Sequence, residues 1–181
     1  MFTISVAGLK RTPAQERRYQ ITGNIETIPG EGDEPVPLVS PVVLQLRITN
    51  AGDFLWAVGD VKATVRLTCS RCIKEFPLDL EGRFEEKYSL HGGANEDSIE
   101  DVAPAADELD FTDQVIETII LSLPMKPLCD EDCKGLCLTC GRDLNTGICG
   151  CPQEIGDPRL AYLSGLLNQK EGGGNGGGTQ T

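Results

Sequence analysis

The sequence has little of what most enzymes and nucleic-acid-binding domains need. Its 181 residues include a single histidine, His91, and no nucleophile elbow, phosphate-binding glycine loop or His-Glu-x-x-His helix. Asp and Glu outnumber Lys and Arg by 28 to 16, so the formal net charge is -12, which argues against simple electrostatic binding of RNA or DNA. We therefore expect a protein that is not an enzyme and has no small-molecule substrate.

Long hydrophobic runs are missing as well. The longest, from Val115 to Met125, is interrupted by Glu117 and Thr118, whereas a membrane-spanning helix needs roughly 20 mostly apolar residues. The first residues, Met-Phe-Thr-Ile-Ser, contain no basic region, so we expect no secretory signal. These absences predict a cytoplasmic protein without a membrane partner.

Cysteine, by contrast, is abundant. The chain has eight cysteines, and six of them lie within the segment 129–151, whereas the other two form a distant Cys-Ser-Arg-Cys pair. Closely spaced cysteines in a reducing compartment more often bind metal than form disulfides, although an even number would also suit a secreted, disulfide-bonded domain. Eight thiolates suffice for two closed tetrahedral sites, for which zinc is the expected ion and iron the alternative. The candidate metal ligands are Cys69, Cys72, Cys129, Cys133, Cys137, Cys140, Cys149 and Cys151.

The spacing of the cysteines leaves two ways of sharing them. In the favoured scheme the later four form a local site, and a second site joins the distant pair to the start of the cluster. These two sets are Cys137, Cys140, Cys149 and Cys151, and Cys69, Cys72, Cys129 and Cys133. The rival scheme pairs Cys69 and Cys72 with Cys137 and Cys140. Either scheme closes both sites with cysteine, which predicts one or two structural rather than catalytic ions.

Hydrophobic periodicity predicts an α+β fold whose sheet is antiparallel. Apolar and polar residues alternate over 42–49 and 61–68, as in half-buried strands. Further strands are expected at the N-terminus, at Tyr19 to Ile28 and at Phe54 to Val58. Alternation resumes after Cys72, so the first cysteine pair is expected at the tip of a hairpin.

The rest of the chain divides by composition. Residues 1–128 are expected to form the β-rich domain, with an acidic mobile loop at 89–108 and one packed helix at about 112–123 that Asp110 or Thr112 caps and Pro124 ends. Residues 129–151 form the cysteine-rich zinc-knuckle segment. A short C-terminal helix is expected at 152–168 and a disordered, glycine-rich tail at 169–181.

Four cations surround the first cysteine pair on an otherwise acidic chain. They are Lys62, Arg66, Arg71 and Lys74, and they are candidate contacts to RNA phosphates. The alternative is that they are solvated side chains on strand faces. The acidic stretch 85–113 instead suits a basic protein partner.

The order of the motifs resembles the YceD-type family, whose members are also called large ribosomal RNA subunit accumulation proteins. The segments that carry the resemblance are Thr68–Cys72, Leu121–Cys129, Asp132–Asn145, Cys149–Cys151 and Asp157–Ala161. The resemblance implies a bacterial or plastid factor in ribosome biogenesis that is needed for normal levels of large-subunit ribosomal RNA, with a large-subunit ribosomal protein or precursor ribosomal RNA as its partner. It also implies that the metal stabilises the protein rather than acting in a reaction.

Two other function classes stay open at this point. A zinc-ribbon module that binds nucleic acid or serves transcription fits the cysteine pairs but not the net charge. A metal-dependent hydrolase of RNA would need an acid–base residue, for which His91 and Asp132 are the only, poor, candidates.

Overall fold

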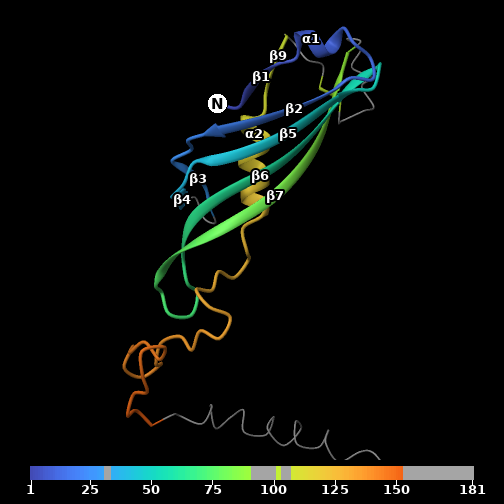
Figure 1. The fold of residues 1–181 in the computed structure, drawn as a ribbon. Helices are drawn as coiled ribbons and strands as arrows, with labels where there is room; N and C mark the ends of the chain where they lie inside the picture. The colour runs from blue at the N-terminus through green and yellow to red at the C-terminus, as the bar shows by residue number, and fades with distance from the viewer. Residues whose placement is uncertain (31–33, 91–100, 103–106, 153–181) are drawn as a thin grey trace, which may run out of the picture. The chain divides into compact units, whose positions relative to one another are not determined.

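The computed structural model describes residues 1–30, 34–90, 101–102 and 107–152 (Figure 1). The chain divides into two compact units, Met1–Leu136 and Cys137–Thr181. The sequence placed a boundary after residue 128, whereas the structure keeps Cys129 and Cys133 with the first unit. The C-terminal helix and tail expected beyond residue 152 lie outside the described residues.

A five-stranded sheet forms the centre of the first unit. Its strands are β2 (Glu16–Gly23), β5 (Val42–Asn50), β6 (Phe54–Thr68), β7 (Glu75–Ser89) and β8 (Asp101–Val102), and they are hydrogen-bonded in that order. Figure 1 shows β2, β5, β6 and β7 side by side. The first four pair antiparallel, and the short β8 pairs parallel with β7. The predicted α+β class with an antiparallel sheet is confirmed.

Two small ribbons and a short helix complete the N-terminal part. Strand β1 (Thr3–Ser5) pairs with β9 (Glu108–Asp110), and β3 (Thr27–Pro29) pairs with β4 (Pro35–Pro37). Helix α1 spans Ala7–Lys10. Within the acidic segment expected to be a loop, β8 is paired with β7, and residues 91–100, which include His91, lie outside the described part of the chain.

Two expected strand boundaries are wrong. The strand expected from Tyr19 to Ile28 ends at Gly23, and Ile28 belongs to the separate β3–β4 ribbon. The break expected at Gly59 does not exist, because β6 runs through it without interruption. A Cβ atom at Gly59 would lie 2.3 Å from ring atoms of Phe84, the residue paired with Gly59 on β7. The absence of a side chain at Gly59 therefore leaves space for the Phe84 ring.

Helix α2 (Thr112–Leu121) covers one face of the sheet, behind the strands in Figure 1. Its buried side chains include Val115 and Ile119, which belong to the main hydrophobic core. The residue at the N-cap position is Phe111, which makes no side-chain cap, so the expected cap by Asp110 or Thr112 is wrong. The Asp110 carboxylate instead precedes the helix and accepts hydrogen bonds from the backbone N–H of Thr112, at 2.9 Å, and from its hydroxyl. The hydroxyl hydrogen bond, the larger cause, holds the pKa of Asp110 below its usual value.

The two faces of the sheet differ in chemistry because side chains alternate along each strand. The face toward α2, which we call the inner face, carries buried residues such as Leu44 and Val61. The opposite face, which we call the outer face, carries exposed residues such as Gln45 and Asp60. In Figure 1 it is turned toward the viewer, and no described helix lies over it.

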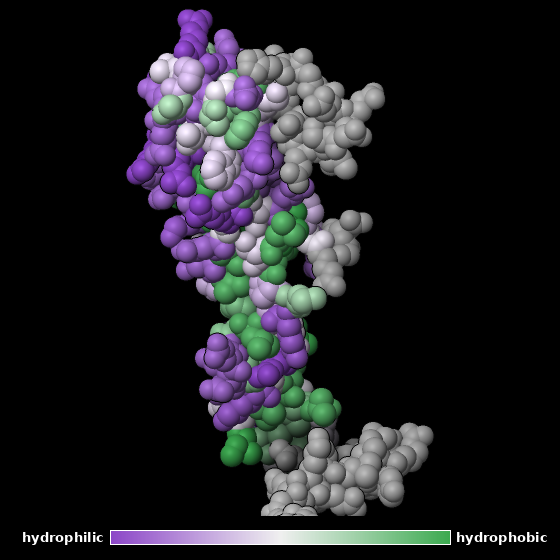
Figure 2. Space-filling view, turned by 90° about the vertical axis from the view of Figure 1, so that its right-hand side faces the viewer, coloured by the Kyte–Doolittle hydropathy of each residue, from purple (hydrophilic) through white to green (hydrophobic). Residues whose placement is uncertain are grey.

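Hydrophobic side chains are also exposed outside the core. Figure 2 shows them near the middle of a face whose upper part is mainly hydrophilic. The described residues at and beyond the end of α2 include Leu121 and Met125, whose relative exposures are 85% and 103%. Among the described residues, no helix is long and apolar enough to cross a membrane.

Candidate metal centres

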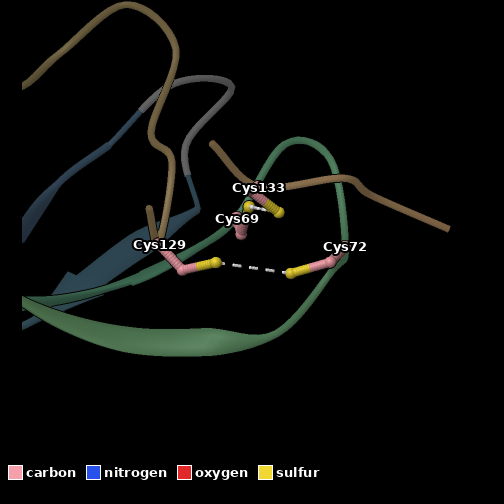
Figure 3. Close-up of side chains that lie close together, drawn as sticks. All are labelled: Cys69, Cys72, Cys129 and Cys133. Carbon is pink, nitrogen blue, oxygen red and sulfur yellow. Dashed lines mark hydrogen bonds between the residues drawn. The ribbon is translucent and has the colours of Figure 1, made fainter. Parts of the chain in front are cut away.

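The first cysteine cluster joins two distant parts of the chain. Cys69 and Cys72 lie at the tip of the β6–β7 hairpin, and Cys129 and Cys133 come from the segment after α2 (Figure 3). The Sγ atoms of Cys69 and Cys133 are 3.8 Å apart, and those of Cys72 and Cys129 are 3.6 Å apart. A tetrahedral zinc ion with Zn–S bonds of about 2.3 Å needs sulfur atoms about 3.8 Å apart. The four thiols are therefore spaced to hold such an ion.

This cluster is shielded from solvent. Cys69, Cys72 and Cys133 are buried, with relative exposures of 1%, 7% and 4%. Phe76, Leu128 and Leu136 pack around them and form a small second hydrophobic core. Four cysteine ligands inside an apolar shell are typical of a closed structural zinc site, which has no open position for a substrate.

Main-chain hydrogen bonds fix the segment after α2 against the hairpin tip. The N–H of Ser70 donates to the Pro127 carbonyl at 2.9 Å, and the N–H of Leu136 donates to the Arg71 carbonyl at 3.2 Å. The Arg71 guanidinium donates to the carbonyls of Cys133, at 2.8 Å, and Glu131, at 3.2 Å. Arg71 therefore holds the loop that presents Cys133, a role that the sequence did not reveal.

The second cluster lies within the second unit. The sulfur atoms of Cys137, Cys140, Cys149 and Cys151 all lie within 4.8 Å of one another, as those of the first cluster do. The sulfur atoms are thus grouped as in the favoured scheme, and the sharing of a metal within each group stays a prediction. Cys140 is exposed and the other three are partly exposed, so this cluster is less shielded than the first.

The two Cys-x-x-Cys turns have the same backbone structure. In the first, the N–H of Cys69 donates to the Lys74 carbonyl at 2.9 Å, and the N–H of Ile73 donates to the Cys69 carbonyl at 3.0 Å. In the second, the N–H of Cys137 donates to the Arg142 carbonyl, and the N–H of Gly141 to the Cys137 carbonyl, both at 2.8 Å. Both turns thus have one backbone geometry, which is compatible with zinc knuckles.

The residue after each Cys-x-x-Cys sequence adopts a left-handed backbone conformation. Gly141 has a φ of 70°, which suits glycine. Ile73 has a φ of 58°, although a β-branched residue is strongly disfavoured there. Its side chain is 69% exposed, so the surrounding knuckle rather than packing of the side chain holds the strained backbone.

The pKa values of the thiols in the first cluster are shifted in opposite directions. Burial raises the pKa of Cys69, but backbone hydrogen bonds from Cys129, Cys72 and Arg71 outweigh this and lower it to about 6. The hydrogen bond shared with Cys72 and burial raise the pKa of Cys129 to about 12. Four thiols so close together resist full ionisation, and a bound divalent cation would favour the thiolate at each of them.

The thiol pKa values of the second cluster are also shifted in opposite directions. Backbone hydrogen bonding from Cys140, followed by the Cys149 side chain, lowers the pKa of Cys137 to about 6. The hydrogen bond shared with Cys140, followed by burial, raises the pKa of Cys151 to about 12. Both donor sets therefore fit zinc, a cation that binds thiolates strongly.

The candidate RNA contacts come from two parts of the fold, and their role stays a prediction. Lys62 and Arg66 project from the outer face, where Lys62 pairs with Glu81 at 2.5 Å. Arg71 and Lys74 belong to the first knuckle, in which the Arg71 side chain is engaged by carbonyl groups. Asp132 lies in a turn where its N–H donates to Asp130 Oδ1 at 2.8 Å.

Comparison with known proteins identifies the family. The model of the large ribosomal RNA subunit accumulation protein YceD matches residues 57–167, which include most of β6, all of β7 and α2, and every cysteine of both clusters. The chain belongs to the YceD family. No solved structure matches it significantly.

Curated relatives come from bacteria and plants. An uncharacterized protein of Mycobacterium tuberculosis is 26% identical over 170 residues, which cover 91% of this chain and 81% of the relative. An uncharacterized protein of Mycobacterium leprae is 28% identical over 166 residues, which cover 86% and 75%. The Zea mays large ribosomal RNA subunit accumulation protein YCED homolog 1, chloroplastic, is 30% identical over 160 residues, which cover 71% and 54%.

Proposed function

We propose that this YceD-family protein is a non-enzymatic cytoplasmic factor in ribosome biogenesis, needed for accumulation or maturation of large-subunit ribosomal RNA. The observation that carries the proposal is the family match, because it spans residues 57–167 and thus the central hairpin, the packed helix and both cysteine clusters. A relative in Zea mays carries the same name, large ribosomal RNA subunit accumulation protein.

The metal has a structural role in this proposal. A catalytic zinc site keeps one position open for water or substrate, whereas each cluster here offers four cysteines, enough to close it. A zinc ion in the first cluster would join the hairpin tip to the loop that presents Cys129 and Cys133. The ion would then stabilise this region of the fold, in which the hydrophobic core around Phe76 and Leu128 contains few residues.

The partner is a large-subunit ribosomal protein or precursor ribosomal RNA. The net charge of -12 favours a basic protein over extended electrostatic contact with RNA. Precursor RNA needs a local surface on which cations outnumber acids, and the residues that line a hollow on the outer face of the sheet provide one, as described below.

Depletion of the protein in cells tests the proposed function. We expect large-subunit ribosomal RNA to fall relative to small-subunit ribosomal RNA, with large subunits lost from sucrose-gradient profiles and restored by the wild-type chain. An unchanged ratio would overturn the proposal. Altered transcription with a normal ratio would instead favour a zinc-ribbon, transcription-associated module, the second reading of the knuckles.

A further inference from the structure

The outer face of the sheet brings aromatic and cationic side chains together on four neighbouring strands. Trp56 of β6 lies opposite Lys87 of β7, and Arg18 of β2 lies opposite Arg47 of β5. Because residues two apart on a strand share a face, Phe54 lies on the same face as Trp56. We call this set the outer-face platform, and its members are Arg18, Arg47, Phe54, Trp56, Arg83 and Lys87.

Two of the platform arginines, Arg18 and Arg47, face each other, whereas Arg83 forms ion pairs with Asp60, at 4.0 Å, and Glu85, at 3.6 Å. Like charges directly opposite each other on neighbouring strands are destabilising, yet Arg18 and Arg47 are paired in register. Arg18 has an ion pair with Glu16, at 2.9 Å. Within the part of the chain that the structure describes, no ion pair includes Arg47. Its guanidinium is therefore available to an anion from outside.

A hollow of about 490 Å³ opens on the same face between β2, β5, β6 and β7. Its lining residues are Arg18, Tyr19, Gln20, Gln45, Leu46, Arg47, Val58, Asp60 and Arg83. Three of these lining residues are cations and one is an acid, a charge of +2 (3 − 1) for the lining itself. Glu16 and Glu85 lie beside the lining and pair with Arg18 and Arg83, so Arg47 is the lining cation that has no ion pair among the described residues. Arginine forks and glutamine amides are the groups that bind phosphate and base edges.

The aromatic residues next to this hollow suit stacking. Trp56 is 43% exposed, although it lies in a strand that is paired on both sides, with Thr49 and Lys87 as its neighbours. Phe54 is partly exposed, and the Nζ atom of Lys87 lies 6.0 Å from the centre of its ring. Aromatic side chains spread on an open sheet, with cations around them, form the surface on which unpaired RNA bases stack.

We propose that the outer-face platform binds a single-stranded segment of RNA, with a base stacked on Trp56 and phosphates held by Arg18 and Arg47. The inference rests on the proposed function and names the RNA as its direct partner. A duplex does not satisfy the platform, because bases stacked within a helix do not offer their faces to Trp56.

Trp56 is the single tryptophan of the chain, so its fluorescence reports directly on the platform. The full-length protein is titrated with single-stranded RNA oligomers of about 12 nucleotides, a length within the range that one such surface covers. We expect saturable quenching, and a slope of about −1.4 for the logarithm of affinity against the logarithm of salt concentration if Arg18 and Arg47 neutralise two phosphates. Quenching by the same sequence as a duplex should be weaker.

Variants distinguish specific binding to the platform from general electrostatic attraction of RNA to the protein. Trp56→Ala and Arg47→Ala, followed by anisotropy of a labelled oligomer, should each weaken binding about tenfold, and Trp56→Phe should retain most of the affinity. Lys126→Ala is the matched control, because it removes an exposed cation outside the platform. Equal effects of Arg47→Ala and Lys126→Ala, or unchanged binding by folded Trp56→Ala, would overturn the proposal.

The depletion experiment distinguishes the failure of this inference from failure of the proposed function. If no RNA binds, but depletion still lowers large-subunit ribosomal RNA, the platform inference is wrong, the function stands and a basic ribosomal protein becomes the expected partner. If depletion leaves the ribosomal RNA ratio unchanged, the proposed function itself is wrong, whatever the platform binds.

Discussion

The strained backbone at Ile73 offers a matched experiment on the two zinc knuckles. Ile73 and Gly141 follow equivalent Cys-x-x-Cys sequences, with φ values of 58° and 70°, but only one is glycine. We predict that Ile73→Gly gives a more stable first unit than Ile73→Ala does. Comparing two small residues at one position removes the loss of the isoleucine side chain from the difference and leaves the effect of the Cβ atom.

The expected difference follows from two opposing effects. A residue with a Cβ atom costs roughly 1–2 kcal/mol in the left-handed region. The greater freedom of glycine in the unfolded chain offsets this by about 0.5–1 kcal/mol. Ile73→Gly should therefore be more stable than Ile73→Ala by about 1 kcal/mol, roughly fivefold in the unfolding equilibrium constant. Gly141→Ala should destabilise its own knuckle by a similar amount, because the φ of 70° disfavours a residue with a Cβ atom. No neighbouring atom lies within 4 Å of the added Cβ atom, so a steric clash does not add to this cost.

Urea unfolding of the zinc-loaded protein measures the difference at position 73, and competition with a chromophoric chelator measures zinc retention in both knuckles. A control that replaces the adjacent exposed Lys74 by glycine or alanine should not favour glycine, because only positions 73 and 141 of these turns have positive φ values. If the alanine and glycine variants at 73 are equally stable, the first knuckle does not have the left-handed turn described here.

Three further perturbations test other parts of the structure. Arg71→Ala should weaken zinc binding by the first cluster about tenfold and leave the second unchanged, because a residue that orients a ligand loop is lost; equal loss from both clusters in chelator competition would contradict this. Gly59→Ala should lower the free energy of unfolding in urea by about 1–3 kcal/mol, because its Cβ atom meets the Phe84 ring; no change would refute the close approach. Asp110→Ala should cost about 0.5–1.5 kcal/mol at neutral pH, as loss of a hydrogen-bond acceptor for the first N–H of the helix does. Because the pKa of Asp110 is lowered in the folded state, this contribution is present above the unfolded value of about 4 and disappears as pH falls through the folded value, so the variant and the parent should converge in acid; a gap independent of pH would contradict it.

Local patterns predicted much of this fold. Alternation over 42–49 and 61–68 gave two central strands, because one face of the sheet is buried and the other is solvated. The apolar stripe around Val115 and Ile119 gave the packed helix. The strand break expected at Gly59 was wrong because the Phe84 ring that fills its place comes from a partner strand, which no local pattern shows.

The metal centres were predictable in composition but not in detail. Cysteine spacing supported the grouping that the structure forms, since the later four cysteines are close in sequence. The brace from Arg71 to the Cys133 carbonyl depends on residues 62 apart and could not be read from either segment. Ile73 was missed because a positive φ is normally signalled by glycine, and here the hydrogen bonds of the knuckle override that preference.

The claim that both cysteine clusters are closed structural zinc sites is tested most directly by native mass spectrometry of the purified full chain. The account predicts two zinc ions per chain, and one in a Cys69→Ser and Cys72→Ser double variant that retains the second cluster. The partly unfolded state of that variant should appear as higher charge states. A wild-type chain that carries no metal would contradict this account. So would disulfide bonds within both clusters in protein purified under reducing conditions.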